Sequence, residues 1–521
     1  MPSSKPLSES PPADKTVAAI DVGANALRMA IAQVLPDGRV EVLERLQQAI
    51  HLGQDTFRRG RLGAQSIGAA VAVLRDYRKL LDLYRVERVR AVATSAVREA
   101  SNADTLIDRV LMTTGLNLEV IGTSEESRLT VSAVLQALEG DPDICRTETL
   151  IADVGGGSTL LTLLHRGEIA NSLSLRLGSI RLQEIFSTTE ESPQRSAELL
   201  RHYIANALAA AHGSLPLKST ESFVAVGGDA RFAAREIGKP TASAEVCLVA
   251  RSQFNRLVRR CQRHTAEELA KRHGLPFAEA ETLNPALLVY QALLQHTRAK
   301  QMIVSHVSMR DGLLLELARN VTGAQDEGLS EGVIHSAMAL AGKYRASLRH
   351  GRNAAELAVR LFDELRAEHG LGPRQRLLLH VAGLLHEVGR FVSSQAHHKH
   401  SFYLINNSEI FGLNREDINL VAHVARYHRR SSPKTAHAEY MALPRPARVT
   451  VSKLAALLRV ADAVARGRVR RMDQVRLQRK ADELILYVPA SGDLILEQRA
   501  LASKADLFED IFGMKIRLER V

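Results

Sequence analysis

Two short stretches combine a carboxylate with the small residues that close contact with a phosphate requires. Asp21 and Asp153 each end an apolar run and are followed by small residues, in "IDVGANALRMAI" and "ADVGGGSTLLTL". Small residues let a backbone approach a ligand closely, and successive N–H groups in such a turn bind an anion. The repeated pattern predicts two equivalent lobes, each offering a phosphate-binding hairpin to a shared cleft. An ordinary β-hairpin turn remains the alternative.

Two common phosphate-binding loops do not match these turns. A P-loop requires a lysine after its glycines, and none follows the glycines 155–157. A dinucleotide-binding loop opens a helix, whereas "STLLTLL" has the composition of a strand.

Three zones along the chain must position these residues. Short apolar runs alternate with helical stretches from Thr16 to Asn320, which indicates α/β architecture. From Leu329 to Val469 the pattern is almost wholly helical, as in "KLAALLRVADAVA". From Gln474 to Val521 strand-like runs return, which predicts a small α+β module.

The whole chain has the composition of a globular protein of three or four domains. It has 521 residues, of which 45% are hydrophobic and 24% charged. No run of about 18 uncharged apolar residues is present, so no membrane span is expected. The Pro/Ser-rich start predicts a disordered tail, and three scattered cysteines fit a reduced cytoplasm.

The net charge of +11 is concentrated in one window. From Val421 to Lys480 there are 15 Lys and Arg residues against 3 Asp and Glu, a local charge of +12. This window predicts a groove for a polyanion such as polyphosphate or nucleic acid. A solvated, arginine-rich surface is the alternative.

A series of motifs in fixed order resembles one family. They are "AAIDVGANALRMAIAQV", "AVATSAVREASN", "IGTSEESRL", "LIADVGGGSTLL", "SLRLGSIRL", "VAVGGDAR" and "VSMRDGLLLEL", followed by "LLHEVGRFVSSQAHHKHSF". Each motif is weak alone. Together they resemble the exopolyphosphatase and guanosine pentaphosphate phosphohydrolase (Ppx/GppA) family, within the superfamily of actin, sugar kinases and heat-shock chaperone ATPases.

The resemblance implies a fold and its boundaries. Two ribonuclease H-like (actin-like ATPase) α/β lobes around a cleft are expected, then an all-helical HD-like domain and a small α+β module. The expected segments are a disordered tail, the first lobe, the second lobe, the helical domain and the C-terminal module, at residues 1–15, 16–137, 138–325, 326–469 and 470–521.

The resemblance also implies an activity. A cytoplasmic enzyme is expected that uses Mg²⁺ to remove the terminal phosphate from inorganic polyphosphate, or the 5′-terminal phosphate from guanosine pentaphosphate. A homodimer is expected as well, and nucleic acid is not expected as a partner. The sequence contains no feature that reads a guanine base, so the preference between the two substrates stays open.

Candidate site residues follow from the matched motifs. Glu126 corresponds to the catalytic glutamate, Asp153 to a catalytic acid that also binds metal, and Asp21 to a second acid near the metal. Arg98 corresponds to an arginine whose planar fork binds phosphate oxygens. The remaining expected substrate contacts are Gly23, Asn25, Gly155, Gly156, Gly157, Ser158, Thr159, Gly227 and Gly228.

Both key assignments have ordinary alternatives. Glu126 is the second acid of "TSEES", which reads as an N-cap with acids in the first turn of a helix. Arg98 has Glu99 and Asp104 nearby for a surface ion pair.

Four positions depart from the family pattern. Leu160 stands where a glutamate implicated in metal binding is usual. Ala24, Ala26 and Asp229 replace small hydroxyl residues. One expectation is that Leu160→Glu lowers the magnesium requirement and raises kcat. The alternative is that Asp229 already fills the role. The departures also indicate an alternative function. In it the chain is a catalytically weakened regulatory protein that binds polyphosphate or an alarmone such as guanosine tetraphosphate.

The helical domain departs from metal-dependent HD phosphohydrolases at one place. His350, His386 and Asp462 match the histidines and the later aspartate, but Glu387 replaces the aspartate of the His-Asp pair. A metal site is one interpretation. The other interpretation is that the imidazoles line an anion channel or pack within the domain. Further histidines lie close by in the sequence, His397, His398, His400, His423 and His428.

Overall fold

The structure is a computed structural model of the chain. It describes residues 15–520, except for 139–145, 187–191, 212–215, 242, 244, 323–326, 430, 466–471, 481 and 490–492. The expected disordered tail therefore lies almost wholly outside the described residues. Two compact units are present, at residues 1–328 and 329–521. Among the described residues, no helix is both long and apolar enough to span a membrane.

The first unit begins with a five-stranded mixed sheet in the order β3-β2-β1-β4-β5. Its strands are β1 (Lys15–Val22), β2 (Ala26–Val34), β3 (Val40–Ala49), β4 (Arg88–Ala93) and β5 (Leu118–Val120). Strand β1 is apolar on both sides because helices cover both faces of the sheet. The helices of this part are α1 (Leu52–Arg59), α2 (Ala64–Leu83), α3 (Ser95–Arg98) and α4 (Ala103–Thr114).

A seven-stranded sheet follows in the order β10-β11-β12-β9-β6-β7-β8. Its strands are β6 (Glu148–Val154), β7 (Thr159–His165), β8 (Glu168–Leu175), β9 (Ser222–Val226), β10 (Lys239–Pro240), β11 (Val246–Ala250) and β12 (Gln301–Ser305). The helices around it are α7 (Ser179–Phe186), α8 (Pro193–Ala211), α9 (Gly228–Ile237), α10 (Arg251–Cys261), α11 (Ala266–His273) and α12 (Phe277–Gln295), with a 3₁₀ turn, η1 (Leu217–Ser219).

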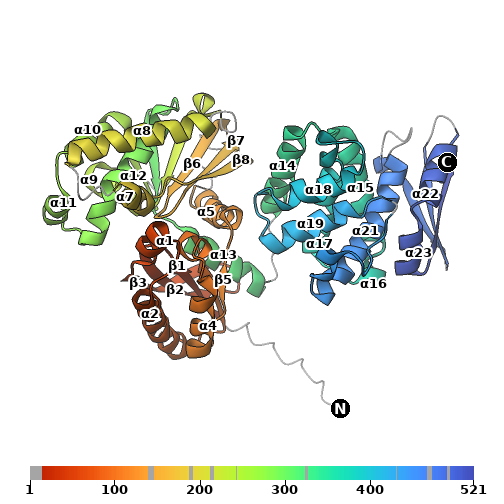
Figure 1. The fold of residues 1–521 in the computed structure, drawn as a ribbon, viewed down its shortest axis with the longest axis horizontal. Helices are drawn as coiled ribbons and strands as arrows, with labels where there is room; N and C mark the ends of the chain where they lie inside the picture. Colours follow the sequence, from red (N-terminus) through yellow and green to blue (C-terminus); the bar gives the residue numbers. More distant parts are fainter. Residues whose placement is uncertain are drawn as a thin grey trace, which may run out of the picture. The chain divides into compact units, whose positions relative to one another are not determined.

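Two helices lie between the sheets, α5 (Thr123–Ala137) and α13 (Met309–Thr322) (Figure 1). They cross at Gly312, where a Cβ atom would lie 2.0 Å from the carbonyl oxygen of Leu129. Only glycine permits this crossing. Helix α13 packs against β1 and β2, so a segment within the range expected for the second lobe covers the first sheet.

The two acid-bearing hairpins have the same register. Asp21 on β1 pairs with Arg28 on β2, and Asp153 on β6 pairs with Leu160 on β7. The side chains of directly paired residues lie on the same face of a sheet. Each aspartate therefore shares its face with the residue seven positions later. The fold class expected from the sequence, two actin-like lobes, is confirmed in this unit.

The second unit is helical with a three-stranded sheet at its C-terminal end (Figure 1). Its helical elements are α14 (Glu327–Lys343), α15 (Leu348–Glu364), α16 (Arg366–His369), α17 (Pro373–Leu385), η2 (Val388–Phe391), α18 (His397–Asn406), α19 (Arg415–Arg426), α20 (Ala438–Met441) and α21 (Arg445–Ala465). The last elements are η3 (Met472–Gln474), β13 (Arg476–Lys480), β14 (Glu483–Val488), α22 (Ile495–Ala502), α23 (Asp506–Phe512) and β15 (Lys515–Arg520). One hydrophobic core joins the helices to this small sheet.

Candidate active site

Glu126 and Arg98 come together beside the start of α5. Glu126 lies in the first turn of α5, where its negative charge complements the helix dipole. Arg98 is the last residue of α3, and its Nη1 atom lies 3.2 Å from Glu126 Oε2. The same nitrogen donates to the carbonyl of Ile121 at 2.7 Å. Glu99, the alternative partner, instead pairs with two other arginines, Arg176 and Arg181.

Helix α5 connects Glu126 to the second hairpin. Thr130 lies one turn after Glu126 on the same helix face, and its hydroxyl donates to Asp153 Oδ2 at 3.3 Å. Ser127 on the adjoining face contacts the Thr162 hydroxyl of β7 at 2.9 Å. The helix therefore fixes the position of the glutamate relative to the aspartate.

The tips of the two hairpins pack directly on neighbouring protein. A Cβ atom on Gly157 would lie 2.3 Å from the Ser95 hydroxyl. A Cβ atom on Gly156 would lie 2.8 Å from the Cδ1 atom of Ile180 and 3.0 Å from the Cβ atom of Ala24. These two glycines thus permit close packing of the second hairpin against the first lobe, as well as any contact with a phosphate.

The other expected substrate contacts differ in accessibility. Gly155 and Gly228 are exposed, and no atom outside their immediate neighbours lies within 4 Å of a Cβ built on Gly228. Ser158 is largely buried. Thr159 is fully buried, and its hydroxyl donates to the carbonyl of Leu177 at 2.8 Å. The Thr159 side chain is thus engaged within the protein.

Three further expected contacts, Gly23, Asn25 and Gly227, lie in tightly packed turns. The side chain of Asn25 donates to the carbonyl of Ala278 on α12 at 3.3 Å. Gly227 has a φ of +125°, a backbone conformation that residues other than glycine rarely adopt. A Cβ atom there would lie 2.8 Å from the Tyr290 hydroxyl. At Gly23 a Cβ would lie 3.1 Å from the carbonyl oxygen of Ala26.

Several cationic side chains and a tyrosine belong to the site although no sequence argument assigned them a role. Arg28 lies 3.5 Å from Asp21, and its charge also acts on Asp153 and Asp229. The other members are Arg231, Tyr290 and Arg310. Arg231 and Arg310 occur in the quoted motifs "VAVGGDAR" and "VSMRDG", and Arg28 stands seven residues after an aspartate. These sequence positions would have allowed the three arginines to be proposed as site residues.

Three carboxylates of the site, Glu126, Asp153 and Asp229, have raised pKa values. Burial raises the pKa of Glu126 to about 7, aided by Asp153 and opposed by Arg98. Burial also raises the pKa of Asp153 to about 6 and that of Asp229 to about 7. Such carboxylates are stabilised in their charged form by a nearby cation. An all-oxygen donor set of this kind suits Mg²⁺, so the residues present fit the expected metal.

Asp229 belongs to the same electrostatic group as Asp153. Both carboxylates act on Arg231 and on the buried hydroxyl of Tyr290, which donates to the carbonyl of Val226. Leu160 is 5% exposed and shares a sheet face with Asp153. Asp229 and Asp153 thus act electrostatically on the same arginine and the same tyrosine.

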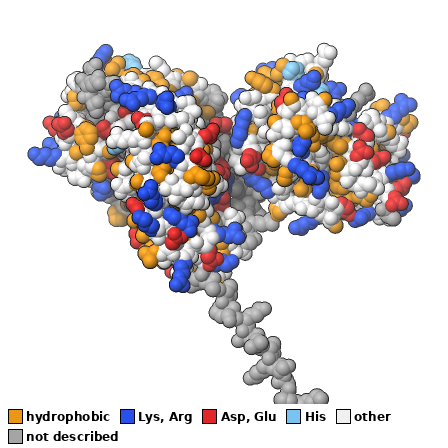
Figure 2. Space-filling model, turned by 60° about the horizontal axis from the view of Figure 1, so that its bottom comes forward, with side chains coloured by type: hydrophobic (Ala, Val, Ile, Leu, Met, Phe, Trp, Pro, Cys, Tyr) orange, Lys and Arg blue, Asp and Glu red, His pale blue; other side chains and the backbone are white. Residues whose placement is uncertain are grey.

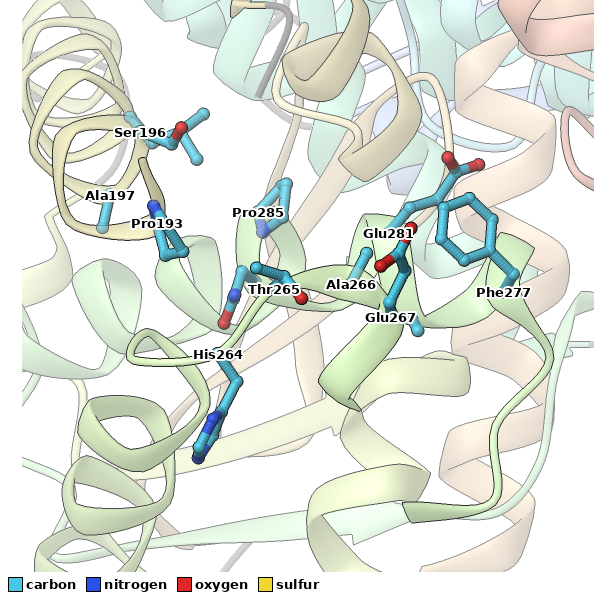
Figure 3. Close-up of a pocket in the computed structure, with 13 residues that line it drawn as sticks. Pro193, Ser196, Ala197, His264, Thr265, Ala266, Glu267, Phe277, Glu281 and Pro285 are labelled. Carbon is cyan, nitrogen blue, oxygen red and sulfur yellow. The ribbon is translucent and has the colours of Figure 1, made fainter. Parts of the chain in front are cut away.

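A separate pocket of about 260 Å³ lies within the second lobe (Figure 3). It is lined by α8, α11 and α12, and its wall includes Glu281 and Asn284. Glu281 accepts hydrogen bonds from Gln54 at 3.2 Å and from Gln183 at 2.9 Å. None of the candidate site residues lines this pocket.

The positively charged window does not form a uniform surface. Arg459 is fully buried and bonds the Lys504 carbonyl and Asp506. Arg426 pairs with Glu439. On the face of the whole chain seen in Figure 2, which does not distinguish this window, Lys and Arg side chains are interspersed with acidic and apolar ones. A groove of about 400 Å³ in the second unit collects three of the window's cations, Arg445, Arg448 and Lys453.

Comparisons with known proteins agree with these observations. The Ppx/GppA phosphatase family matches residues 30–321, and domain III of the Ppx/GppA phosphatases matches residues 334–509. The chain is 22% identical over 415 residues to a guanosine-5′-triphosphate,3′-diphosphate pyrophosphatase of Photobacterium profundum, covering 80% of each chain. It is 28% identical over 318 residues to exopolyphosphatase 2 of Mycobacterium tuberculosis, covering 58% of this chain and 98% of that protein.

Solved structures show the same fold. A Ppx/GppA family member of Aquifex aeolicus matches with a TM-score of 0.50 and 26% identity, over 59% of this chain and 99% of its own. An exopolyphosphatase of Cytophaga hutchinsonii matches with a TM-score of 0.54 and 23% identity, over 59% and 98%. Because both family domains match in order and together span most of its length, the chain belongs to the Ppx/GppA phosphatase family.

Proposed function

We propose that this phosphatase is an exopolyphosphatase, which hydrolyses the terminal phosphate of inorganic polyphosphate with Mg²⁺. Guanosine pentaphosphate is the second candidate substrate, because one relative is named for each activity. The observation that carries the proposal is the Glu126 carboxylate. It lies beside Arg98 and next to both acid-bearing hairpins, and burial raises its pKa to about 7.

In this mechanism Glu126 accepts the proton of the water that attacks the terminal phosphorus. A base with a pKa near the working pH combines the correct protonation state with a useful proton affinity. Arg98 binds phosphate oxygens with its planar fork, and its hydrogen bond to Ile121 sets the direction of that fork. Gly228 is exposed at the first position of α9, so the backbone N–H groups of that first helical turn can bind further phosphate oxygens.

Asp153 and Asp21 would hold the magnesium ion, with Asp229 as a further carboxylate. Mg²⁺ at this position supplies charge stabilisation to the phosphate that is transferred. Thr130 orients Asp153 through its hydroxyl, and Arg28 orients Asp21. Ligands held by such contacts keep their geometry when a metal arrives or leaves.

One assay tests the proposal directly. Phosphate release is measured against polyphosphate chain length with Mg²⁺, and kcat/KM is compared with that for guanosine pentaphosphate. Glu126→Ala serves as the control for contaminating activity. Release from long polyphosphate that exceeds the control supports the exopolyphosphatase. A preference for guanosine pentaphosphate would assign the second substrate.

A catalytically weakened binding protein is the alternative function. Leu160 and the alanines Ala24 and Ala26 favour it, because they remove a carboxylate and two hydroxyls that the family pattern contains. Turnover no greater than that of Glu126→Ala, with tight binding of polyphosphate or an alarmone, would establish this function.

The pH dependence of the reaction follows from the raised pKa values. Protonated Glu126 cannot accept a proton, so kcat/KM is expected to rise with pH through about 7 at low Mg²⁺. The midpoint belongs to the coupled carboxylates rather than to one residue. Saturating Mg²⁺ favours the charged forms and should move the midpoint to lower pH. Profiles from pH 5 to 9 at two Mg²⁺ concentrations test this, and a flat profile would contradict it.

The groove that contains Arg445, Arg448 and Lys453 is proposed to bind the polymer. Replacing these three residues with glutamine should weaken binding of long polyphosphate much more than that of short chains. It should also reduce the salt dependence, because fewer counterions are released. Binding measured at several salt concentrations checks this, with exposed Arg499 changed to glutamine as a matched control. Equal effects on long and short chains would indicate a merely solvated surface.

A cytoplasmic homodimer is proposed from the family resemblance. Light scattering at micromolar concentration tests the dimer, and a monomeric mass would contradict it.

A further inference from the structure

A compact cluster of histidine and carboxylate side chains lies in the second unit, outside the candidate active site. His350 comes from α15, His386 and Glu387 follow the end of α17, and Asp462 comes from α21. Positions up to 112 residues apart in the chain thus contribute to one cluster. His386 and Asp462 are completely buried, and His350 lies at the edge of the cluster with 15% of its side chain exposed.

The donor atoms of this cluster converge on one point. The Nε2 atom of His350 lies 3.0 Å from Asp462 Oδ1 and 3.3 Å from His386 Nε2. The distance from His386 Nε2 to Asp462 Oδ1 is also 3.3 Å. Glu387 Oε2 lies 3.9 Å from His350 Nε2, and all four donors fall within 4.8 Å of one another. Ligands about 2.1 Å from a metal ion lie about 3.0 to 3.4 Å apart, so His350, His386 and Asp462 have the spacing of a coordination sphere and Glu387 lies farther out.

The orientation of the imidazoles supports the same conclusion. His386 Nδ1 donates to the carbonyl of Gly383 at 2.7 Å, and His350 Nδ1 donates to the carbonyl of Ala465 at 3.4 Å. A neutral imidazole that donates through Nδ1 presents a lone pair at Nε2. The two lone pairs would then face each other at 3.3 Å, which is unfavourable unless a metal ion or a proton lies between them. Anchoring of Nδ1 by a carbonyl is also typical of metal-bound histidines.

Each carboxylate of the cluster is paired with a cation. The Lys504 ammonium pairs with Asp462 Oδ2, which leaves Oδ1 directed at the two histidines. Arg390 Nη1 lies 3.1 Å from Glu387 Oε2. Contacts of this kind fix the orientation of metal-binding carboxylates.

A second pair of histidines repeats the arrangement nearby. His397 and His428 are both buried, and their Nε2 atoms lie 3.1 Å apart. Their Nδ1 atoms bond the carbonyls of Ser394 and Ala425. The ring of His428 packs against the ring of His386, with centroids 4.9 Å apart. The interior of this unit therefore contains two adjacent places where imidazole lone pairs converge.

We propose that His350, His386, Glu387 and Asp462 bind a divalent first-row transition metal, such as Mn²⁺, Fe²⁺ or Zn²⁺. A donor set of two imidazoles and two carboxylates favours these ions over Mg²⁺ and Ca²⁺, which prefer oxygen ligands throughout. The site is separate from the proposed Mg²⁺ site, and it does not depend on the proposed function. The competing arrangement is a metal-free cluster in which a proton on His350 and the Lys504 ammonium balance the carboxylates.

Metal content of the full-length chain tests the proposal. Purified protein is stripped with chelator and dialysed against Mn²⁺ or Zn²⁺, and the bound metal is counted by elemental analysis. His350→Gln is the main variant, because the side chain lies at the edge of the cluster. His380→Gln, on α17 but outside the cluster, is the matched control for loosely bound metal. Asp153→Asn removes an expected ligand of the active-site metal.

The expected result is at least one metal ion per chain in the wild type, in His380→Gln and in Asp153→Asn. When each is combined with Asp153→Asn, His350→Gln and Asp462→Asn should retain less than a tenth of that amount. The metal should also raise the Tm of the wild type but not of His350→Gln, because an ion that binds only the folded state stabilises it. Circular dichroism confirms that each variant is folded. Absence of tightly bound metal, or equal metal in folded His350→Gln, would overturn the proposal.

Discussion

Glu126→Gln is expected to lower kcat on polyphosphate by about 10²-fold or more, with KM changed by less than about threefold. Glutamine keeps the shape of the side chain and its contact with Arg98, but it cannot accept a proton from water. The loss should therefore fall on the chemical step and not on substrate binding. Steady-state kinetics on long-chain polyphosphate, together with direct binding measurements, separate the two effects.

A matched substitution on the same helix controls for damage to α5. Glu125, one residue earlier, is buried and pairs with Arg90 on β4 and with Arg128 instead of Arg98. Glu125→Gln should affect stability more than kcat. A kcat near that of the wild type in Glu126→Gln would remove Glu126 from the role of general base.

Asp229→Thr is expected to lower kcat by about 10²-fold and to raise the Mg²⁺ concentration for half-maximal rate. The metal stabilises charge in the transition state, so weaker metal binding should lower kcat more than it weakens substrate binding. The structure supports this because Asp229 and Asp153 act on the same arginine, Arg231. Leu160→Glu alone should slow the enzyme, since a further carboxylate beside Asp153 adds repulsion among groups whose pKa is already raised.

The double variant decides between the two explanations of Leu160. Leu160→Glu combined with Asp229→Thr restores the usual family residue at both positions. If Asp229 replaces the missing glutamate, the double variant should recover about 10-fold or more of the activity lost in Asp229→Thr. Magnesium titrations of all four proteins measure this. A gain in kcat from Leu160→Glu alone would instead show that the wild-type site lacks a carboxylate.

Local patterns in the sequence were sufficient for the two acid-bearing hairpins. An apolar run, an aspartate, small residues and a second apolar run predict a strand, a turn and a strand, because these preferences act over a few residues. Asp21 and Asp153 do end such strands, and the equal spacing to Arg28 and Leu160 reflects a shared register. The motif order further indicated the family, and the family matches confirm it.

The ionic surroundings of these acids depended on tertiary structure. Arg28, Arg231 and Arg310 lie on three different elements, and nothing in the local sequence states that they act on one group of carboxylates. Arg310, for example, lies on α13 two residues before Gly312, where this helix packs closely against Leu129 of α5.

The roles of the small residues were also indicated in part by the sequence and in part only by the fold. Composition alone indicated bare backbone at Gly155, Gly156 and Gly157, but only the fold distinguishes exposed Gly155 from two glycines packed against the first lobe. The same holds for the four donors around His350, which come from three separate segments of the second unit. A sequence determines the chemistry that each side chain can perform. Which side chains meet is decided by sheet register, helix crossings and burial, since these set distances between positions that the chain keeps far apart.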